Sequence, residues 1–456
     1  MMKFKLIVLH FLLANIFSFN AQNIYPDDAY PNMNKEMKTF MEDGGWCWYE
    51  DPRAIINNGK LIIGAISGMS GDIRVGIYDL ENDKNLGTVV LDKNFEIDDH
   101  NSPVFHARPD GSLVAMWAEH GHEKFHYYSI SDPNDYLKWG ERQVFDHGFE
   151  IPEGARWRGV TYMNLYTIEK QKLVYNFFRD GVTYNPTFIT SSDDGSTWGN
   201  RNHLIMDEVG GRQRPYARYM QRNKNMVGIS FTDGHPDTYG NSLYYTDFDG
   251  TSFYKADGTK IKDLTDGPLK TSEADKVFTG SETITKQEGN GSVLNSAWTC
   301  DLEKDKAGNP FIGYTLYKKE NDIRFRLANW NGEKWVDREI AYAGPGLYPT
   351  QSSYTGLMAL DNENPNNIFI SSAVNPNTGK EQNKKHEIYF AEVDGENSIS
   401  NLKWKQLTFN SEYKNIRPIT VHGEGYKVVL WLGGGPWRHF QSYESNILGY
   451  ILEKPN

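Results

Sequence analysis

The sequence is poor in cysteine, with only Cys47 and Cys300 among its 456 residues. No spaced Cys/His zinc motif can be built from two such distant residues. Export from the cell would permit a disulfide between them, although nothing in their spacing requires one. We expect both to be packed thiols, with the disulfide as the alternative.

Long apolar runs are lacking after the first few residues. Lys3 and Lys5 precede an apolar run from Leu6 to Phe17, and the run ends in SFNAQ, which is the layout of a secretory signal peptide. The run is shorter than the roughly 20 residues needed to cross a bilayer. We therefore expect residues 1–21 to be removed after Ala21, and residues 22–456 to be exported, to the periplasm or outside the cell, without membrane insertion.

The chain also lacks a positive charge balance, with a formal net charge of −12 at pH 7. This argues against nucleic acid as a partner. The window from Arg142 to Arg222, however, contains nine arginines, two lysines and nine acidic residues, so it is net positive in an acidic protein. Guanidinium groups offer a planar fork of donors to a carboxylate or a sulfate, whereas ordinary surface ion pairs are the alternative explanation.

Helical periodicity is almost missing, and short strand-like runs bounded by Gly, Asn, Asp and Pro recur instead. Clear examples are KLIIGAIS, SLVAMWAE, KLVYNFF, NMVGISFT, PFIGYTLY and YKVVLWLG. The pattern predicts an all-β protein.

Turn motifs indicate how these strands are arranged. Several turns with Asp or Asn and Gly lie beside strands ending in Trp or Tyr, as in RPDGSLVAMW and NWNGEKW. SSDDGSTW at residues 191–198 fits an Asp box, a structural turn whose side chains bond their own hairpin and which recurs in β-propellers. Repeated four-stranded units over about 410 residues predict a single-domain, seven-bladed β-propeller with roughly 58 residues per blade.

Histidines gather in two segments, DDHNSP and WAEHGH, which read as consecutive strands of one blade. His100 and His120 are then expected near each other at one rim of the ring, with Asn101 beside them. A histidine that is simply satisfied by neighbouring acids is the alternative for each one. We expect the flanking Asp and Asn groups to orient the His100 imidazole.

Two further pairs of strands carry candidate site residues. RWRGVTYMNLY and VYNFFRDG place Tyr162 and Arg179 on adjacent strands, and Arg179 follows an apolar run where a guanidinium needs a partner. GGRQRPYARY and FTDGHP add Arg214, Tyr216 and His235 in the next blade. Tyr162 alone could equally be a core or rim aromatic residue.

These residue types together suit proton abstraction next to a carboxylate. No catalytic triad, P-loop or HExxH motif occurs, whereas a paired-carboxylate glycosidase stays possible because 60 acids always leave candidates. Removal of the C5 proton of a uronic acid requires neutralisation of its carboxylate, a base, and an acid for the group leaving C4. Arg179 can supply the first, and His100 and Tyr162 the other two.

The chain resembles BNR-repeat-like secreted bacterial proteins, a group that includes seven-bladed ulvan lyases and related rhamnosidases. The resemblance is carried by GGWCWYEDPRAI, DDHNSP, GVTYMNLY, FFRDG, RPYARY, FTDGHP, NSLYY and NIRPI, in that order. It implies that His100 and Tyr162 are catalytic, that Arg179 neutralises the carboxylate, and that His120, Tyr216 and His235 lie in the same cleft. A rhamnosidase of this group would carry a histidine near the N-terminus, and GGWCWYEDPR has none.

The expected function is thus a carbon–oxygen lyase acting by β-elimination on a uronate of an ulvan-type sulfated polysaccharide or its oligosaccharides. The leaving group would be a sugar for an ulvan lyase, or water for a dehydratase acting at a non-reducing end. An exo-rhamnosidase and a non-catalytic glycan-binding propeller are the alternatives. We expect no cofactor for catalysis, although some lyases of the group hold a structural metal near the position of His235.

Overall fold

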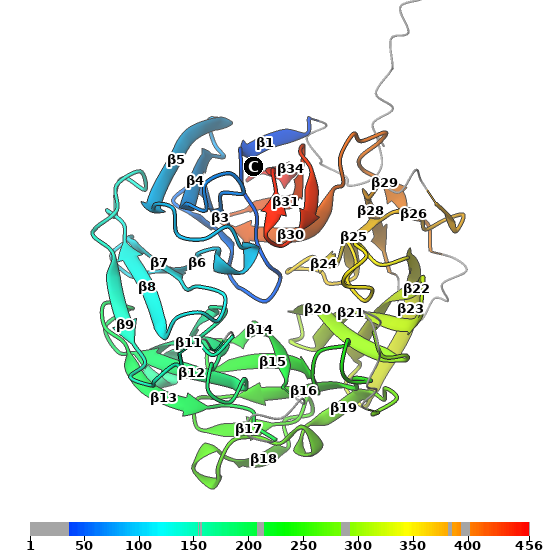
Figure 1. The fold of residues 1–456 in the computed structure, drawn as a ribbon, viewed down its shortest axis with the longest axis horizontal. Helices are drawn as coiled ribbons and strands as arrows, with labels where there is room; N and C mark the ends of the chain where they lie inside the picture. Colours follow the sequence, from blue (N-terminus) through cyan, green and yellow to red (C-terminus); the bar gives the residue numbers. More distant parts are fainter. Residues whose placement is uncertain are drawn as a thin grey trace, which may run out of the picture.

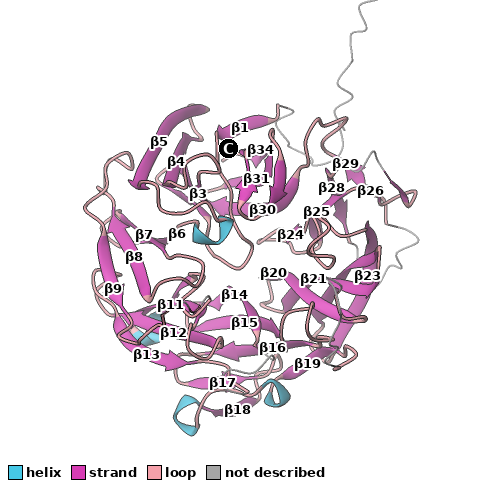
Figure 2. Cartoon of the chain, viewed as in Figure 1, coloured by secondary structure: helices cyan, strands magenta, loops and turns pink. Residues whose placement is uncertain are grey.

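A ring of β-sheets surrounds a central axis in the computed structural model (Figure 1). The structure describes residues 36–153, 155, 157–207, 214–283, 292–381, 385–393 and 402–455. The seven large sheets confirm the prediction of an all-β, seven-bladed propeller, and the only helices in the described part are short 3-10 turns (Figure 2). The predicted signal peptide, residues 1–21, lies outside the described residues.

The first four blades follow one another along the chain, each running from an inner to an outer strand. Their strands are β2 (Ala54–Asn57), β3 (Lys60–Ile66), β4 (Ile73–Asp79) and β5 (Lys84–Asp92); β6 (Val104–Ala107), β7 (Leu113–Trp117), β8 (Phe125–Ile130) and β9 (Gln143–Asp146); β10 (Leu165–Ile168), β11 (Leu173–Arg179), β12 (Pro186–Ser191) and β13 (Gly199–His203); and β14 (Tyr216–Asn223), β15 (Met226–Thr232), β16 (Leu243–Phe248), β17 (Ser252–Tyr254), β18 (Lys260–Asp263) and β19 (Asp275–Phe278).

The last three blades complete the ring, and the seventh takes its outermost strand from the beginning of the described chain. Their strands are β20 (Ser296–Lys304), β21 (Pro310–Lys319), β22 (Asp322–Trp330) and β23 (Trp335–Gly344); β24 (Met358–Leu360), β25 (Asn367–Ser372), β28 (Glu387–Glu392) and β29 (Lys405–Gln406); and β30 (Ile416–Gly423), β31 (Tyr426–Gly433), β34 (Asn446–Glu453) and β1 (Lys38–Met41). Two small hairpins project from them, β26 (Val374–Asn375) with β27 (Lys380–Glu381) and β32 (Trp437–His439) with β33 (Ser442–Tyr443).

The second strand of each blade is buried on both faces because neighbouring blades pack face to face. In β31 every residue is buried, and in β3 every residue after Lys60 is buried. This explains why KLIIGAI and YKVVLWLG are continuous apolar runs, since a strand that is buried on both faces does not alternate between apolar and polar residues. The outer strand β5 has no fully buried residue.

Two local predictions are confirmed by the structure. In the Asp box, Ser191 Oγ donates to Asp193 at 2.7 Å, and the Thr197 amide and hydroxyl donate to the same carboxylate at 2.8 and 2.7 Å. Cys47 and Cys300 are both free and buried. Within the described ranges, no helix has the length and apolarity that a membrane crossing requires.

Candidate active site

The segment GGWCWYEDPR crosses the centre of the ring between β1 and β2 (Figure 1). The indoles of Trp46 and Trp48 each donate to a backbone carbonyl, of Arg417 and Thr299 respectively, at 3.3 Å. Asn164 Nδ2 donates to the Tyr49 carbonyl at 3.0 Å. Since Trp48 lines a cavity on each side, this central segment divides the space along the axis into two cavities.

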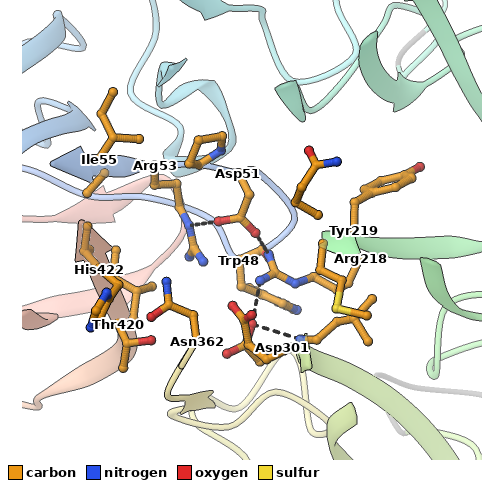
Figure 3. Close-up of a pocket in the computed structure, with 18 of the residues that line it drawn as sticks. Trp48, Asp51, Arg53, Ile55, Arg218, Tyr219, Asp301, Asn362, Thr420 and His422 are labelled. Carbon is orange, nitrogen blue, oxygen red and sulfur yellow. Dashed lines mark hydrogen bonds and ion pairs between the residues drawn. The ribbon is translucent and has the colours of Figure 1, made fainter. Parts of the chain in front are cut away.

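The larger cavity, of about 530 Å³, is lined by charged groups that neutralise one another (Figure 3). Asp51 lies 3.3 Å from Arg53 Nε and 2.5 Å from Arg218 Nη1, and Arg218 Nη2 donates to Asp301 at 2.9 Å. These ion pairs hold the central segment to β14 and β20. Since the carboxylates already balance the two guanidiniums, we do not place the active site here despite the larger volume.

The smaller cavity, of about 170 Å³, brings together all the predicted site residues except Asn101. It contains His100, His120, Tyr162, Arg179, Arg214, Tyr216 and His235. Sequence reasoning missed its remaining lining residues, which are nearly all aromatic: Trp48, Tyr49, Trp157, Trp298, Gln351, Tyr354 and Phe440.

His100 and His120 form a stacked pair on one shared carboxylate. Their rings are 3.8 Å apart between centroids and inclined by 10°. Asp98 accepts a hydrogen bond from each Nδ1, at 2.7 Å from His100 and 3.0 Å from His120. Since an ionised carboxylate can only accept hydrogen bonds, both Nδ1 atoms carry a proton. The Nε2 atom of each ring is then the position that can gain or lose a proton.

The surroundings of the two imidazoles separate their pKa values. Burial opposes the charged form of His100, but the Cys47 and Asp98 side chains outweigh it and hold the pKa of His100 well above 6.5. Burial, and then the charge of His100, lowers the pKa of His120 to about 3 although Asp98 opposes this. One ring of the pair is therefore charged at neutral pH and the other is not.

Tyr162 faces the pair with a constrained backbone. Its φ is +68°, a left-handed conformation that is rare for a bulky residue, and its ring lies 5.8 Å from that of His100. His126 Nε2 donates to the Tyr162 carbonyl at 3.2 Å and its Nδ1 accepts from His147 Nε2 at 2.8 Å. Burial raises the pKa of Tyr162, and the charges of Arg179 and His100 only partly offset this. The phenol is thus protonated at rest.

Arg179 supplies a buried positive charge beside Tyr162. The side chain of this residue at the end of β11 donates to Tyr216 Oη at 3.2 Å and to Thr161 Oγ1 at 3.0 Å, and its Nε has no hydrogen-bond partner within the described ranges. The guanidinium carbon lies 5.1 Å from the Tyr162 ring centroid. Among the described residues no carboxylate pairs with it, so the cavity offers a charge that is free to bind an anion.

His235, Tyr216 and Trp298 form another part of the cavity wall. The His235 ring lies 5.6 Å from that of Tyr216 and 4.9 Å from that of Trp298. Its Nδ1 accepts from the Asp237 amide at 3.2 Å, so Nε2 carries the proton and faces Tyr354 Oη at 3.4 Å. Burial, with the nearby Arg214 and Arg179, lowers the pKa of His235 to about 3.

Asn101 does not line this cavity. It is fully buried, and its Nδ2 donates to Glu96 at 2.9 Å. Asp98, together with Asp99 at 3.2 Å from His100 Nδ1, therefore orients the His100 imidazole, whereas the Asn101 amide holds the loop before β6.

Two sets of donor atoms in the described residues are close enough to hold a metal ion, Asp98 with His100 and His120, and Cys47 with Asp99 and His100. In the first set both imidazole Nδ1 atoms already donate to the carboxylate. We therefore interpret these groups as a network that holds protons. A structural metal near His235 stays a prediction.

Fold and site together define a seven-bladed β-propeller with an aromatic cavity on its axis, which carries a buried arginine that no carboxylate of the described residues pairs with. The chain belongs to the BNR repeat-containing family, whose model matches residues 64–343. No curated protein sequence matches it.

Solved structures share the fold at low identity. An ulvan lyase of polysaccharide lyase family 25, bound to GlcA(1-4)Rha3S, superimposes with a TM-score of 0.59 and 13% identity over 92% of this chain and 98% of its own. The polysaccharide lyase Uly1 gives a TM-score of 0.54 and 12% identity over 88% of this chain and 90% of its own.

Proposed function

We propose that the protein is a carbon–oxygen lyase that acts by β-elimination on a glucuronic or iduronic acid residue of an ulvan-type sulfated polysaccharide or its oligosaccharides. The observation that carries the proposal is Arg179, a buried guanidinium with no carboxylate partner in the described part of the chain, beside a phenol and an imidazole. The likeness to ulvan lyase structures supports the same class of substrate.

Arg179 binds the uronate carboxylate in this mechanism. Neutralising the carboxylate lets the electrons left by the C5 proton spread onto its oxygens, which lowers the barrier to proton removal. The charge is effective because the site is buried, with Arg179 and Tyr162 each only 7% exposed. Tyr216 Oη and Thr161 Oγ1 fix the guanidinium in place before substrate binds.

For the elimination, one of the two groups His100 and Tyr162 must be deprotonated to act as the base, and the other must carry a proton to act as the acid. At rest the pair holds a charged imidazole and a neutral phenol, which is one proton too many. Loss of that proton leaves one group able to take the C5 proton and the other able to protonate the C4 oxygen as the bond to C4 breaks. Which group does which depends on the face of the sugar ring that carries the C5 hydrogen.

The burial of the site residues favours attack at the end of a chain. His100 is only 5% exposed, and Trp157, Tyr354 and Phe440 from three different connections form the walls. A terminal uronate would fit with its C4 hydroxyl inward, so that water leaves, whereas an internal residue would need a groove open at both ends.

The test is to incubate the protein with oligosaccharides ending in a uronate and to follow ultraviolet absorbance and product mass. A rise in absorbance from the 4,5-unsaturated uronate is expected, with loss of one water per molecule for a dehydratase or chain cleavage for a lyase. Reducing sugar released without absorbance would identify a glycosidase such as the rhamnosidase alternative. Binding without any product would identify a glycan-binding propeller.

A further inference from the structure

Three arginines in the described part of the chain have no carboxylate within ion-pair distance and lie close to one another. Most arginines in the described part of the chain form ion pairs with Asp or Glu, including Arg142 with Asp92 at 2.6 Å. Among the described residues, no carboxylate pairs with Arg158, Arg179 or Arg214. In a protein of net charge −12, unpaired arginines gathered at one place indicate a site for anions.

The three guanidiniums alternate with tyrosine rings in a continuous series. Arg179 lies 5.1 Å from the Tyr162 centroid and 5.8 Å from the Tyr216 centroid. Arg214 lies 5.9 Å from the same Tyr216 centroid. Arg214 and Arg158 then lie 5.2 and 5.1 Å from the Tyr184 centroid. The series thus runs from the catalytic Tyr162 to the half-buried Arg158.

Hydrogen bonds and close backbone packing fix the loop that carries Tyr184. Tyr184 has a φ of +63°, and its amide donates to the Asp180 carbonyl at 2.8 Å. The Asp180 carboxylate accepts from Thr183 and is paired with Arg201. Gly181 lies against the backbone of Arg158, where a Cβ would meet the Arg158 carbonyl oxygen at 2.1 Å. The two segments are therefore packed directly onto each other.

We propose that Arg158, Tyr184 and Arg214 form a second anion subsite, which binds a sulfate ester on the sugar next to the uronate. The inference rests on the proposed function, because that function assigns the uronate carboxylate to Arg179. Arg179 and Arg214 lie 5.8 and 5.9 Å from the Tyr216 centroid, and Arg158 lies beyond Arg214 at Tyr184, so we assign the second anion to the neighbouring sugar. A sulfate ester has three free oxygens and can accept from two guanidiniums at once, whereas a planar carboxylate is satisfied by one.

The test uses the variants Arg158→Gln and Arg214→Gln with a matched control. Arg142→Gln also removes a guanidinium stacked on a tyrosine, at 4.8 Å from the Tyr127 centroid, but that arginine is paired with Asp92 and lies outside the cavity. The readout is the ratio of kcat/KM for a sulfated uronate oligosaccharide to kcat/KM for the same oligosaccharide after desulfation. A charge-assisted contact makes this ratio fall about tenfold in each subsite variant, mainly through KM, and stay unchanged in Arg142→Gln.

Equal losses on both substrates, an unchanged ratio, or the same fall in Arg142→Gln would overturn the subsite. If the protein turned over neither substrate, the proposed function would fail, and calorimetric binding of the two oligosaccharides would then decide on the subsite alone. Tighter binding of the sulfated form that is lost in Arg158→Gln supports it. Equal binding of both forms to the unsubstituted protein contradicts it.

Discussion

The charge on His100 depends on a carboxylate that it shares with His120. Asp98 accepts from both rings, and the stacked geometry makes it unfavourable for both to be protonated at once. This arrangement fixes which of the two imidazoles carries the extra proton, and it leaves the Nε2 of His100 as the titrating position nearest to Tyr162. The number of protons that the two imidazoles hold is therefore set by the Asp98 carboxylate.

The three proposed catalytic residues should each be indispensable. His100→Asn, Tyr162→Phe and Arg179→Ala are expected to lower turnover by roughly 1,000-fold or more, because each removes a proton donor or acceptor or the charge that neutralises the carboxylate. Initial rates of absorbance increase measure this, and circular dichroism checks folding. Tyr78→Phe is the control, since that hydroxyl bonds Asp83 on an outer part of the first blade. Near-normal rates in all three variants would refute the assignment.

The pH dependence of kcat/KM should show the loss of the one proton that the His100 and Tyr162 pair must release before it can act. Activity is expected to rise as pH rises through the pKa of His100, so the acid limb lies above 6.5. Asp98→Asn removes a charge that raises this pKa, and the limb should move to lower pH while the maximal rate falls. A limb that stays in place or moves upward would contradict this role. Among the described residues, the ionisable groups that interact with His100 include Cys47, Glu50, Asp98, Asp99, His120, Tyr162 and Tyr348.

At the scale of elements, hairpins and loops decide which residues meet. The hairpin of β6 and β7 brings His100 and His120 together, and the sequence predicted this because the two histidines flank one turn. Tyr162 was predicted on a strand, but it lies just before β10 with a left-handed backbone held by His126. No local sequence pattern predicts this backbone conformation, because the hydrogen bond from His126 that stabilises it is a tertiary contact.

The Asp box should contribute to stability and not to catalysis. Asp193→Ala removes the acceptor of Ser191 Oγ and of the Thr197 amide and hydroxyl. Because this turn is solvent-exposed, the expected loss in free energy of unfolding is only about 1 kcal/mol. Urea unfolding measures the loss, and turnover per folded molecule should be unchanged. A large fall in turnover would show that the turn is coupled to the site.

At the scale of the molecule, ring closure explains what sequence reasoning missed. Repeated turn signals were enough to predict seven blades, since each blade is a local unit. Trp298 and Tyr354 reach the cavity from the fifth and sixth blades, more than a hundred residues from Tyr162 in the chain. Their contact with Trp48 exists only because the ring closes and the central segment crosses it.

Closure of the seventh blade by β1 should be essential for stability. Phe40 is fully buried at the junction of β1 with β34, and Phe40→Ala is expected to lower the free energy of unfolding by about 3–5 kcal/mol. Thr39→Ala, the exposed neighbour on the same strand, should change it by less than about 0.5 kcal/mol. Guanidinium unfolding curves compare the two. Equal effects would mean that β1 contributes little to closing the ring.

The most direct test of the central claim is a crystal structure of the Tyr162→Phe variant with a bound uronate oligosaccharide. The account predicts the uronate carboxylate in hydrogen-bond contact with Arg179, with C5 facing residue 162 or His100 and the C4 oxygen facing the other. A sugar bound in the larger cavity, or bound here with its carboxylate away from Arg179, would contradict it.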